Sequence, residues 1–156
     1  FDVHHGNGTQ EIFYNDKNVA YGSSHEFPLF PGTGSEEEIG VGNIFNATIK
    51  AGTKGKEFIK IFQQKILNPI DKFKPEVILI SAGFDAHTRD PLANINLESI
   101  DFYEITKRIV DLANVHCKFS LQVFLQFSLF RCPCKAFSKV KCNSVARIIE
   151  RYYWVS

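Results

Sequence analysis

Residues 76–83 read Glu-Val-Ile-Leu-Ile-Ser-Ala-Gly, an apolar run rich in β-branched side chains that follows Pro75. A run of this length between a proline and a glycine predicts a strand that is buried on both faces. The rest of the fold prediction depends on this strand, because the patterns on either side of it are helical.

Upstream of the strand, residues 54–67 carry Phe58, Phe62 and Ile66 at four-residue spacing, with Lys or Gln on the other face. This spacing predicts an amphipathic helix. Pro69 is expected to interrupt the helix, and a shorter helical piece should lead to the strand.

Downstream of the strand, apolar residues spaced 3, 4 and 3 apart predict a helix that begins near Ser99. Ser99 is expected to be the N-cap, with Asp101 in the first turn. The alternation of helix, buried strand, loop and helix predicts an α/β fold with a parallel sheet.

The first part of the chain is less regular. Residues 1–26 predict the end of a strand, a loop and a short strand around 19–23 that ends near His25. Residues 27–42 are rich in Pro, Gly and acids, which predicts a loop.

Composition is that of a globular protein, with 44% hydrophobic and 22% charged residues. The formal net charge of +1 singles out neither nucleic acid nor a membrane surface as a partner. Residues 118–156 differ from the rest, because they are rich in Phe and hold seven Lys or Arg against one acid. We therefore divide the chain into residues 1–117 and a basic tail, 118–156, for which nucleic-acid binding is an unlikely role.

Two short segments hold residues that suit metal chemistry. Asp2 and His4 are two positions apart, so on a strand their side chains share a face. Asp85 directly follows the predicted strand, and ligands of α/β sheets bind beyond the carboxyl ends of strands. Carboxylate and imidazole ligands suit zinc, although an isolated pair of this kind more often caps loop amides.

Four motifs in this order resemble the histone deacetylase family, over residues 1–116. They are Asp2-Val3-His4-His5-Gly6-Asn7-Gly8-Thr9-Gln10, Ser24-His25-Glu26-Phe27-Pro28 with Phe30-Pro31-Gly32-Thr33-Gly34, Ala82-Gly83-Phe84-Asp85-Ala86-His87, and Asp90-Pro91-Leu92 with the helix near Ser99. Their form is most similar to the class II, bacterial acetoin-utilisation and acetylpolyamine amidohydrolase branches. The resemblance implies a three-layer α/β/α, arginase/deacetylase-like fold with a mainly parallel sheet.

The resemblance also implies site residues. Asp2, His4 and Asp85 would hold Zn²⁺ for hydrolysis of acetylated lysine or, in the alternative, acetylated polyamine. The backbone near Asp2 and His4, with Ser23 and Ser24, would hold a monovalent cation, K⁺. Phe30 would be an aromatic wall of the acyl-lysine tunnel. His5, His25 and His87 are expected to order loops or pack, rather than to bind metal.

The family's tandem His pair and its Tyr match no residue of this chain, so no catalytic residue is predicted. Met is absent and the first motif begins at Asp2, so we expect an interior piece of a longer protein, truncated at both ends. After Lys118 there is no Gly, which excludes the Gly-rich turn that carries the family's Tyr. We therefore expect little deacetylation by this piece alone.

Two other classes stay open. One is a non-catalytic remnant that binds metal or a partner. The other is an arginase-type site with two manganese ions, which would need more carboxylates beside Asp2-Val3-His4 than His5 and Gly6 offer. The absence of a targeting segment favours the cytoplasm, with the nucleus as the alternative, and no apolar run is long enough for a membrane span.

Overall fold

The computed structural model describes residues 1–91, 94–117, 122–125 and 148–150, so most of the predicted tail and Leu92 lie outside the described residues. All strand pairs are parallel. One pair joins β1 (Tyr21–Glu26) to β2 (Ile44–Ile49), and a three-stranded sheet has the order β3 (Leu79–Ala82), β4 (Gln122–Leu125), β5 (Ile148–Glu150). The predicted α/β class with a parallel sheet is confirmed.

The first three residues join the two sheets. They lie between β1 and β3 and bond to both through the backbone, as an added strand would. The four bonds are Phe1 N to Ser81 O (3.0 Å), Gly83 N to Phe1 O (2.8 Å), Asp2 N to Ser24 O (3.4 Å) and Glu26 N to Val3 O (2.9 Å). Residues 1–4 are nevertheless not assigned to a strand, because the chain bends at Val3 and His4, which corrects the prediction of a strand end here.

A long helical stretch covers one face of the strands. It runs through α2 (Gly55–Phe62), the π-helical turn η1 (Gln63–Leu67) and α3 (Asn68–Phe73). The prediction that Pro69 interrupts the helix was wrong, because Pro69 lies in the first turn of α3. The wider π turn before it accommodates a residue that has no N–H to donate.

The second long helix is α4 (Ser99–His116). Its N-cap is Glu98 and not Ser99, which corrects the prediction. Glu98 and Asp101 form a capping box, in which Glu98 N donates to Asp101 Oδ2 at 2.8 Å. The reciprocal pair satisfies two backbone donors, whereas a serine one position later could satisfy only one.

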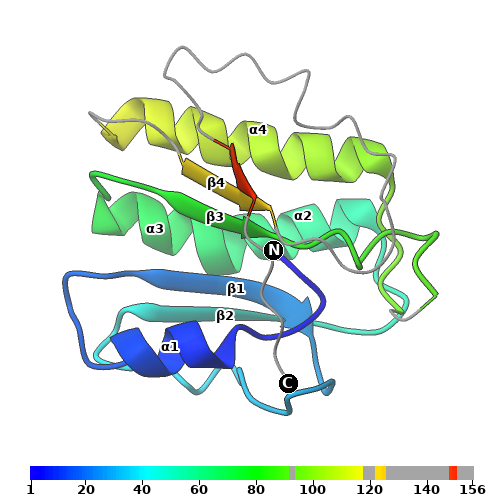
Figure 1. Ribbon diagram of the computed structural model, residues 1–156, viewed down its shortest axis with the longest axis horizontal. Helices are drawn as coiled ribbons and strands as arrows, with labels where there is room; N and C mark the ends of the chain where they lie inside the picture. The colour runs from blue at the N-terminus through cyan, green and yellow to red at the C-terminus, as the bar shows by residue number, and fades with distance from the viewer. Residues whose placement is uncertain (92–93, 118–121, 126–147, 151–156) are drawn as a thin grey trace.

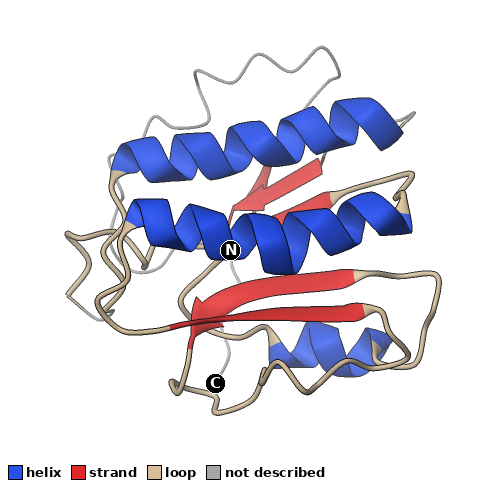
Figure 2. Ribbon diagram, turned by 180° about the vertical axis from the view of Figure 1, so that it is seen from behind, coloured by secondary structure: helices blue, strands red, loops and turns tan. Residues whose placement is uncertain are grey.

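The elements form three layers (Figures 1 and 2). Helices α2, α3 and α4 cover one face of the strands, and α1 (Asn7–Phe13) lies on the other face. Helix α1 replaces part of the predicted loop, and β2 was not predicted. The loop at 27–42 is confirmed, and β1 ends at Glu26, close to the predicted end near His25, but begins two residues later than predicted, at Tyr21. No helix in the described part of the chain combines the length and apolarity needed to cross a bilayer.

Strand β3 is buried on one face only, which corrects the prediction of burial on both. Ile80 and Ala82 are buried, whereas Leu79 is 62% exposed. The helices α2 and α4 pack with the side that carries Ile80, so burial alternates along the strand.

Helix α4 supports the loop that follows β3. The ring of Phe102, which is fully buried, packs edge-on against Phe84 with centroids 5.2 Å apart and stacks on His87 at 6.1 Å. Leu97 continues this support through the backbone, since its N–H donates to Ala86 O at 3.0 Å. The core therefore holds the chain on both sides of Asp85.

We expect Phe102→Ala to lower the free energy of unfolding by about 3–5 kcal/mol, because it removes a fully buried ring. Urea unfolding followed by circular dichroism measures this loss. The control is Ile100→Ala on the same helix, where the side chain is 67% exposed and the change should stay within about 0.5 kcal/mol. Equal losses in the two variants would contradict this packing.

Candidate metal centre

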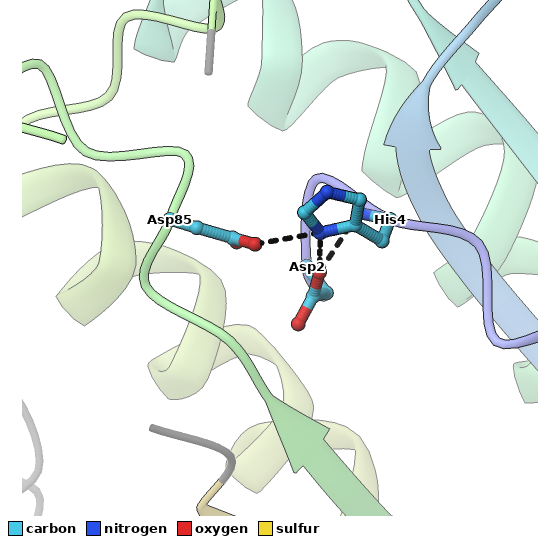
Figure 3. Close-up of side chains that lie close together, drawn as sticks. All are labelled: Asp2, His4 and Asp85. Atoms are coloured by element: carbon cyan, nitrogen blue, oxygen red, sulfur yellow. Dashed lines mark hydrogen bonds and ion pairs between the residues drawn. The ribbon is translucent and has the colours of Figure 1, made fainter. Parts of the chain in front are cut away.

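Two loop segments bring three potential metal ligands to one edge of the sheet. Asp2 and His4 come from the N-terminal segment, the first residues of which lie between β1 and β3. Asp85 comes from the loop after β3 (Figure 3). One ligand atom from each residue lies within 4.8 Å of the others. The structure thus brings together the three residues for which the sequence predicted a metal site.

The imidazole of His4 lies between the two carboxylates. Its Nδ1 is 2.9 Å from Asp85 Oδ2 and 3.3 Å from Asp2 Oδ1. The side chain of His4 is 44% exposed, whereas those of Asp2 and Asp85 are 19% and 6% exposed. The site is open to solvent on the histidine side and closed on the carboxylate side.

Backbone groups fix the orientation of both carboxylates. Asp85 Oδ1 accepts the N–H of Val3 at 3.0 Å, which turns Oδ2 toward His4. Asp2 Oδ1 accepts the N–H of His4 at 2.8 Å. These bonds hold the two acids in place independently of any bound ion.

Gly83 provides the space that Asp2 needs. A Cβ at position 83 would lie 2.0 Å from Asp2 Oδ2 and 2.5 Å from its Cγ, so no side chain fits there. The glycine that ends the predicted strand thus has a role in the site, which the sequence pattern showed only as a strand boundary.

The electrostatics of the three groups are linked. Hydrogen bonds to Asp2 and Asp85 raise the pKa of His4 to about 10. Burial raises the pKa of Asp85. Burial also acts to raise the pKa of Asp2, but hydrogen bonds from His4 outweigh it and the pKa is lowered. Two carboxylates around one imidazole thus favour a positive charge at Nδ1.

The donor set fits a zinc ion. Ligand atoms about 2.0–2.1 Å from a tetrahedral zinc lie roughly 3.3 Å from one another. The distances from His4 Nδ1 to the two carboxylate oxygens, 3.3 and 2.9 Å, are close to this value. Three protein ligands with a fourth position open are the pattern of catalytic rather than structural zinc.

The other predicted site residues lie nearby or at the surface. Ser24 is buried, its Oγ has no hydrogen-bond partner among the residues that the structure describes, and its carbonyl accepts from Asp2 N. Ser23 Oγ is 3.0 Å from His25 Nδ1. Phe30 is 79% exposed, on the loop before Gly32.

Three histidines near the site make hydrogen bonds that order loops. His5 bonds to Thr33 Oγ1 (2.7 Å) and Gln10 Oε1 (3.0 Å). His25 Nε2 is 2.9 Å from Gly34 O, and its ring is 4.7 Å from that of His5. His87 accepts from Arg89 N at 3.1 Å through Nδ1.

Sequence reasoning assigned no role to Gln10 or Glu38, which the structure places beside His5. Gln10 donates to Glu38 Oε2, and Glu38 Oε1 accepts from the backbone N–H groups of Gly34 and Ser35. Gln10 ends the first motif, but nothing in the spacing of polar residues pairs it with Glu38.

Comparisons with known proteins agree on one family. The family model of the histone deacetylase domain matches residues 1–126 of this chain. The match extends a little beyond the boundary predicted at residue 117, and the position at which the tail begins stays a prediction. A probable deacetylase of Archaeoglobus fulgidus is 39% identical over 130 residues, 81% of this chain and 36% of that protein. Histone deacetylase 14, chloroplastic, of Arabidopsis thaliana is 37% identical, over 81% of this chain and 31% of that protein.

Solved structures give the same answer. The crystal structure of the HDA15 HD domain superposes with a TM-score of 0.74 at 36% sequence identity, covering 81% of this chain and 37% of that one. The chain therefore spans about a third of the length of the relatives that it matches.

We expect Gly83→Ala to weaken zinc binding roughly 10- to 100-fold, the usual effect of disturbing a residue that orients a ligand. The added methyl group would push the Asp2 carboxylate out of place. Competition with a chromogenic chelator measures the affinity. The control is Gly8→Ala, because a Cβ there meets nothing within 4 Å; equal affinity of both variants would show that Gly83 has no such role.

A second prediction concerns pH. Burial lowers the pKa of His25 from 6.5 to about 4, so the folded state takes up fewer protons than the unfolded chain below pH 6.5. The contribution of His25 to the free energy of unfolding should therefore fall as pH drops from 6.5 to 5, opposite in sign to that of His4. Urea titrations across this range should show a smaller decrease for His25→Phe, although that variant starts from a lower stability. Parallel decreases would refute the assignment.

Proposed function

Because this chain belongs to the histone deacetylase family, we propose that it supplies the zinc ligands of a deacetylase that hydrolyses acetylated lysine side chains. The observation that carries the proposal is the position of Asp2, His4 and Asp85 around one point, beyond the carboxyl end of β3. That edge of a parallel sheet is where α/β enzymes bind their ligands.

Each ligand has a defined part in the proposed site. Asp85 and Asp2 offer carboxylate oxygens whose orientation the backbone N–H groups already set. His4 offers Nδ1, which must lose its proton before it can bind metal. A bound zinc ion would act as a Lewis acid on the carbonyl of the acetyl group.

The substrate approaches from the open side of the site. His4 and Phe30 are the exposed members of the predicted set, with the histidine side chain 44% and the whole phenylalanine residue 79% exposed. An exposed ring offers an apolar surface to the methylene groups of an acyl-lysine side chain. The same surface would accept an acetylated polyamine, which is the alternative substrate.

A monovalent cation, K⁺, is proposed beside the zinc ligands. Ser24 supports this, because within the described part of the chain its buried Oγ lacks a hydrogen-bond partner, and its carbonyl accepts from Asp2 N. Buried polar atoms without a partner are rare in folded proteins. With Ser23 and the backbone of Asp2 and His4, this oxygen would complete an oxygen-rich site.

We assign proton transfer and oxyanion stabilisation to no residue of this chain. Both are needed for rapid amide hydrolysis, and each contributes at least roughly 10²-fold in rate. The protein substrate and the compartment stay predictions. The sequence favours the cytoplasm, whereas the Arabidopsis relative is named as chloroplastic.

The test is the zinc content of the purified chain and of Asp85→Asn. We expect about one zinc per chain for the parent, as the ligand set found among the described residues implies. Asp85→Asn should bind at least roughly tenfold more weakly, because it removes a charged ligand from a buried position. Mass spectrometry of the metal content and chelator competition measure both.

The matched control is Glu76→Gln, which removes the same charge from an exposed position. It should bind zinc as the parent does. Full zinc content in Asp85→Asn would exclude the proposed ligand set, and two metals per chain would favour the arginase-type alternative.

A further inference from the structure

Beside the proposed metal ligands lies a row of three hydrogen-bonded polar side chains, two of them buried and Glu38 half-buried, that the proposed chemistry does not use. It runs from His5 through Gln10 to Glu38 and ends on the backbone of the loop at Gly34 and Ser35. His5 and Gln10 are 4% and 6% exposed. Buried polar groups in such numbers need a reason, since an apolar core would pack as well.

The donors and acceptors of these hydrogen-bonded side chains fit in one way only. Glu38 accepts, so the amide nitrogen of Gln10 faces it and the carbonyl of Gln10 faces the other way. That carbonyl accepts from Asn46 Nδ2 at 2.7 Å and from His5 Nε2 at 3.0 Å. His5 therefore carries its proton on Nε2, and its Nδ1 accepts from the hydroxyl of Thr33.

These hydrogen bonds act on the proposed metal site through the main chain of residues 3–5. Val3, which precedes His4, is fully buried and donates its N–H to Asp85. His5, which follows His4, is held by its hydrogen bond to Gln10. The peptide groups on both sides of His4 are therefore fixed. The side chain of His4 is 44% exposed, and its Nδ1 bonds to Asp85 and Asp2. These bonds hold one atom of the ring, and the position of its Cα is set by the two residues beside it.

The loop packs onto the same imidazole. Gly34 has φ +89°, and a Cβ there would lie 2.6 Å from His5 Cγ and 2.5 Å from His25 Nε2. The backbone of the loop therefore rests directly on the rings of both histidines. Phe30 lies four residues before Gly34 on this loop. The hydrogen-bonded residues His5, Gln10 and Glu38, here called the clamp, therefore connect the loop that carries Phe30 to the segment that carries Asp2 and His4.

We infer that Gln10 and Glu38 are positioning residues for the metal ligand His4, acting through His5. This inference rests on the proposed zinc site. The clamp sets the angle at which the imidazole of His4 meets the metal, and it ties that angle to the loop that carries Phe30.

Exchange of the two side chains tests the inference. In Glu38→Gln, an amide would face the amide of Gln10, and two donors would meet. In Gln10→Glu, two carboxylates would meet. In the double variant the exchanged pair restores every bond, because Gln at 38 can donate to Glu at 10 and accept from the loop, while Glu at 10 accepts from His5 and Asn46.

The measurements are zinc affinity, by chelator competition, and the visible absorption spectrum of the Co²⁺-loaded chain, which reports ligand geometry. Each single variant should bind zinc roughly tenfold more weakly and shift the Co²⁺ bands. The double variant should restore both to within about twofold. Glu37→Gln, an exposed neighbour, is the control and should match the parent.

Thermal unfolding of each variant separates positioning from stability. Single variants that melt earlier but keep the parental affinity and Co²⁺ spectrum would overturn the inference, as would a double variant that fails to recover either readout. If the parent chain binds no metal, the proposed zinc site and this inference both fall. Metal bound by the parent and unchanged in the single variants would overturn the inference alone.

Discussion

The hydrogen bond from the Val3 amide to Asp85 Oδ1, 3.0 Å long, connects the sheet to the site. It uses one carboxylate oxygen to hold the ligand segment and leaves the other directed at His4. Val3 is fully buried, and its carbonyl accepts from Glu26 at the end of β1. One residue therefore links β1, the loop after β3 and two of the three ligands, and the three-layer arrangement places all of them at one edge.

Burial gives this site a strong preference for a cation. Asp85 is 4% exposed, and a carboxylate at such depth is costly unless a positive charge or several donors compensate it. In the metal-free chain a protonated His4 provides that charge, which is why its pKa rises while burial raises that of Asp85. A divalent ion would replace the proton and neutralise both acids. Metal binding and the stability of the fold are coupled in this way.

The three candidate ligands could be picked out from the sequence by their positions and by the motifs that resemble the family, and the structure brings them together. The spacing of Asp2 and His4 is that of a strand face, although the chain bends between them, and Asp85 follows a recognisable apolar run. Periodicity could not show that β3 is covered on one face only, because an apolar run looks the same whether one side or both is packed. Nor could it show that a π turn lets the helix pass Pro69, since such turns depend on packing rather than on composition.

Helix α1 and the clamp were beyond these rules for a different reason. Gly6 and Gly8 flank the start of α1, a pattern typical of a loop, and the helix has no side-chain cap to signal it. Gln10 and Glu38 are 28 residues apart, and polar residues carry no period that would pair them. Yet the most exposed ligand, His4, is the one whose position depends on them. The carboxylates of Asp2 and Asp85 accept from the backbone N–H groups of His4 and Val3, and within the described residues neither is hydrogen-bonded to Gln10 or Glu38, so it is through His4 that changes at Gln10 and Glu38 would reach a bound metal.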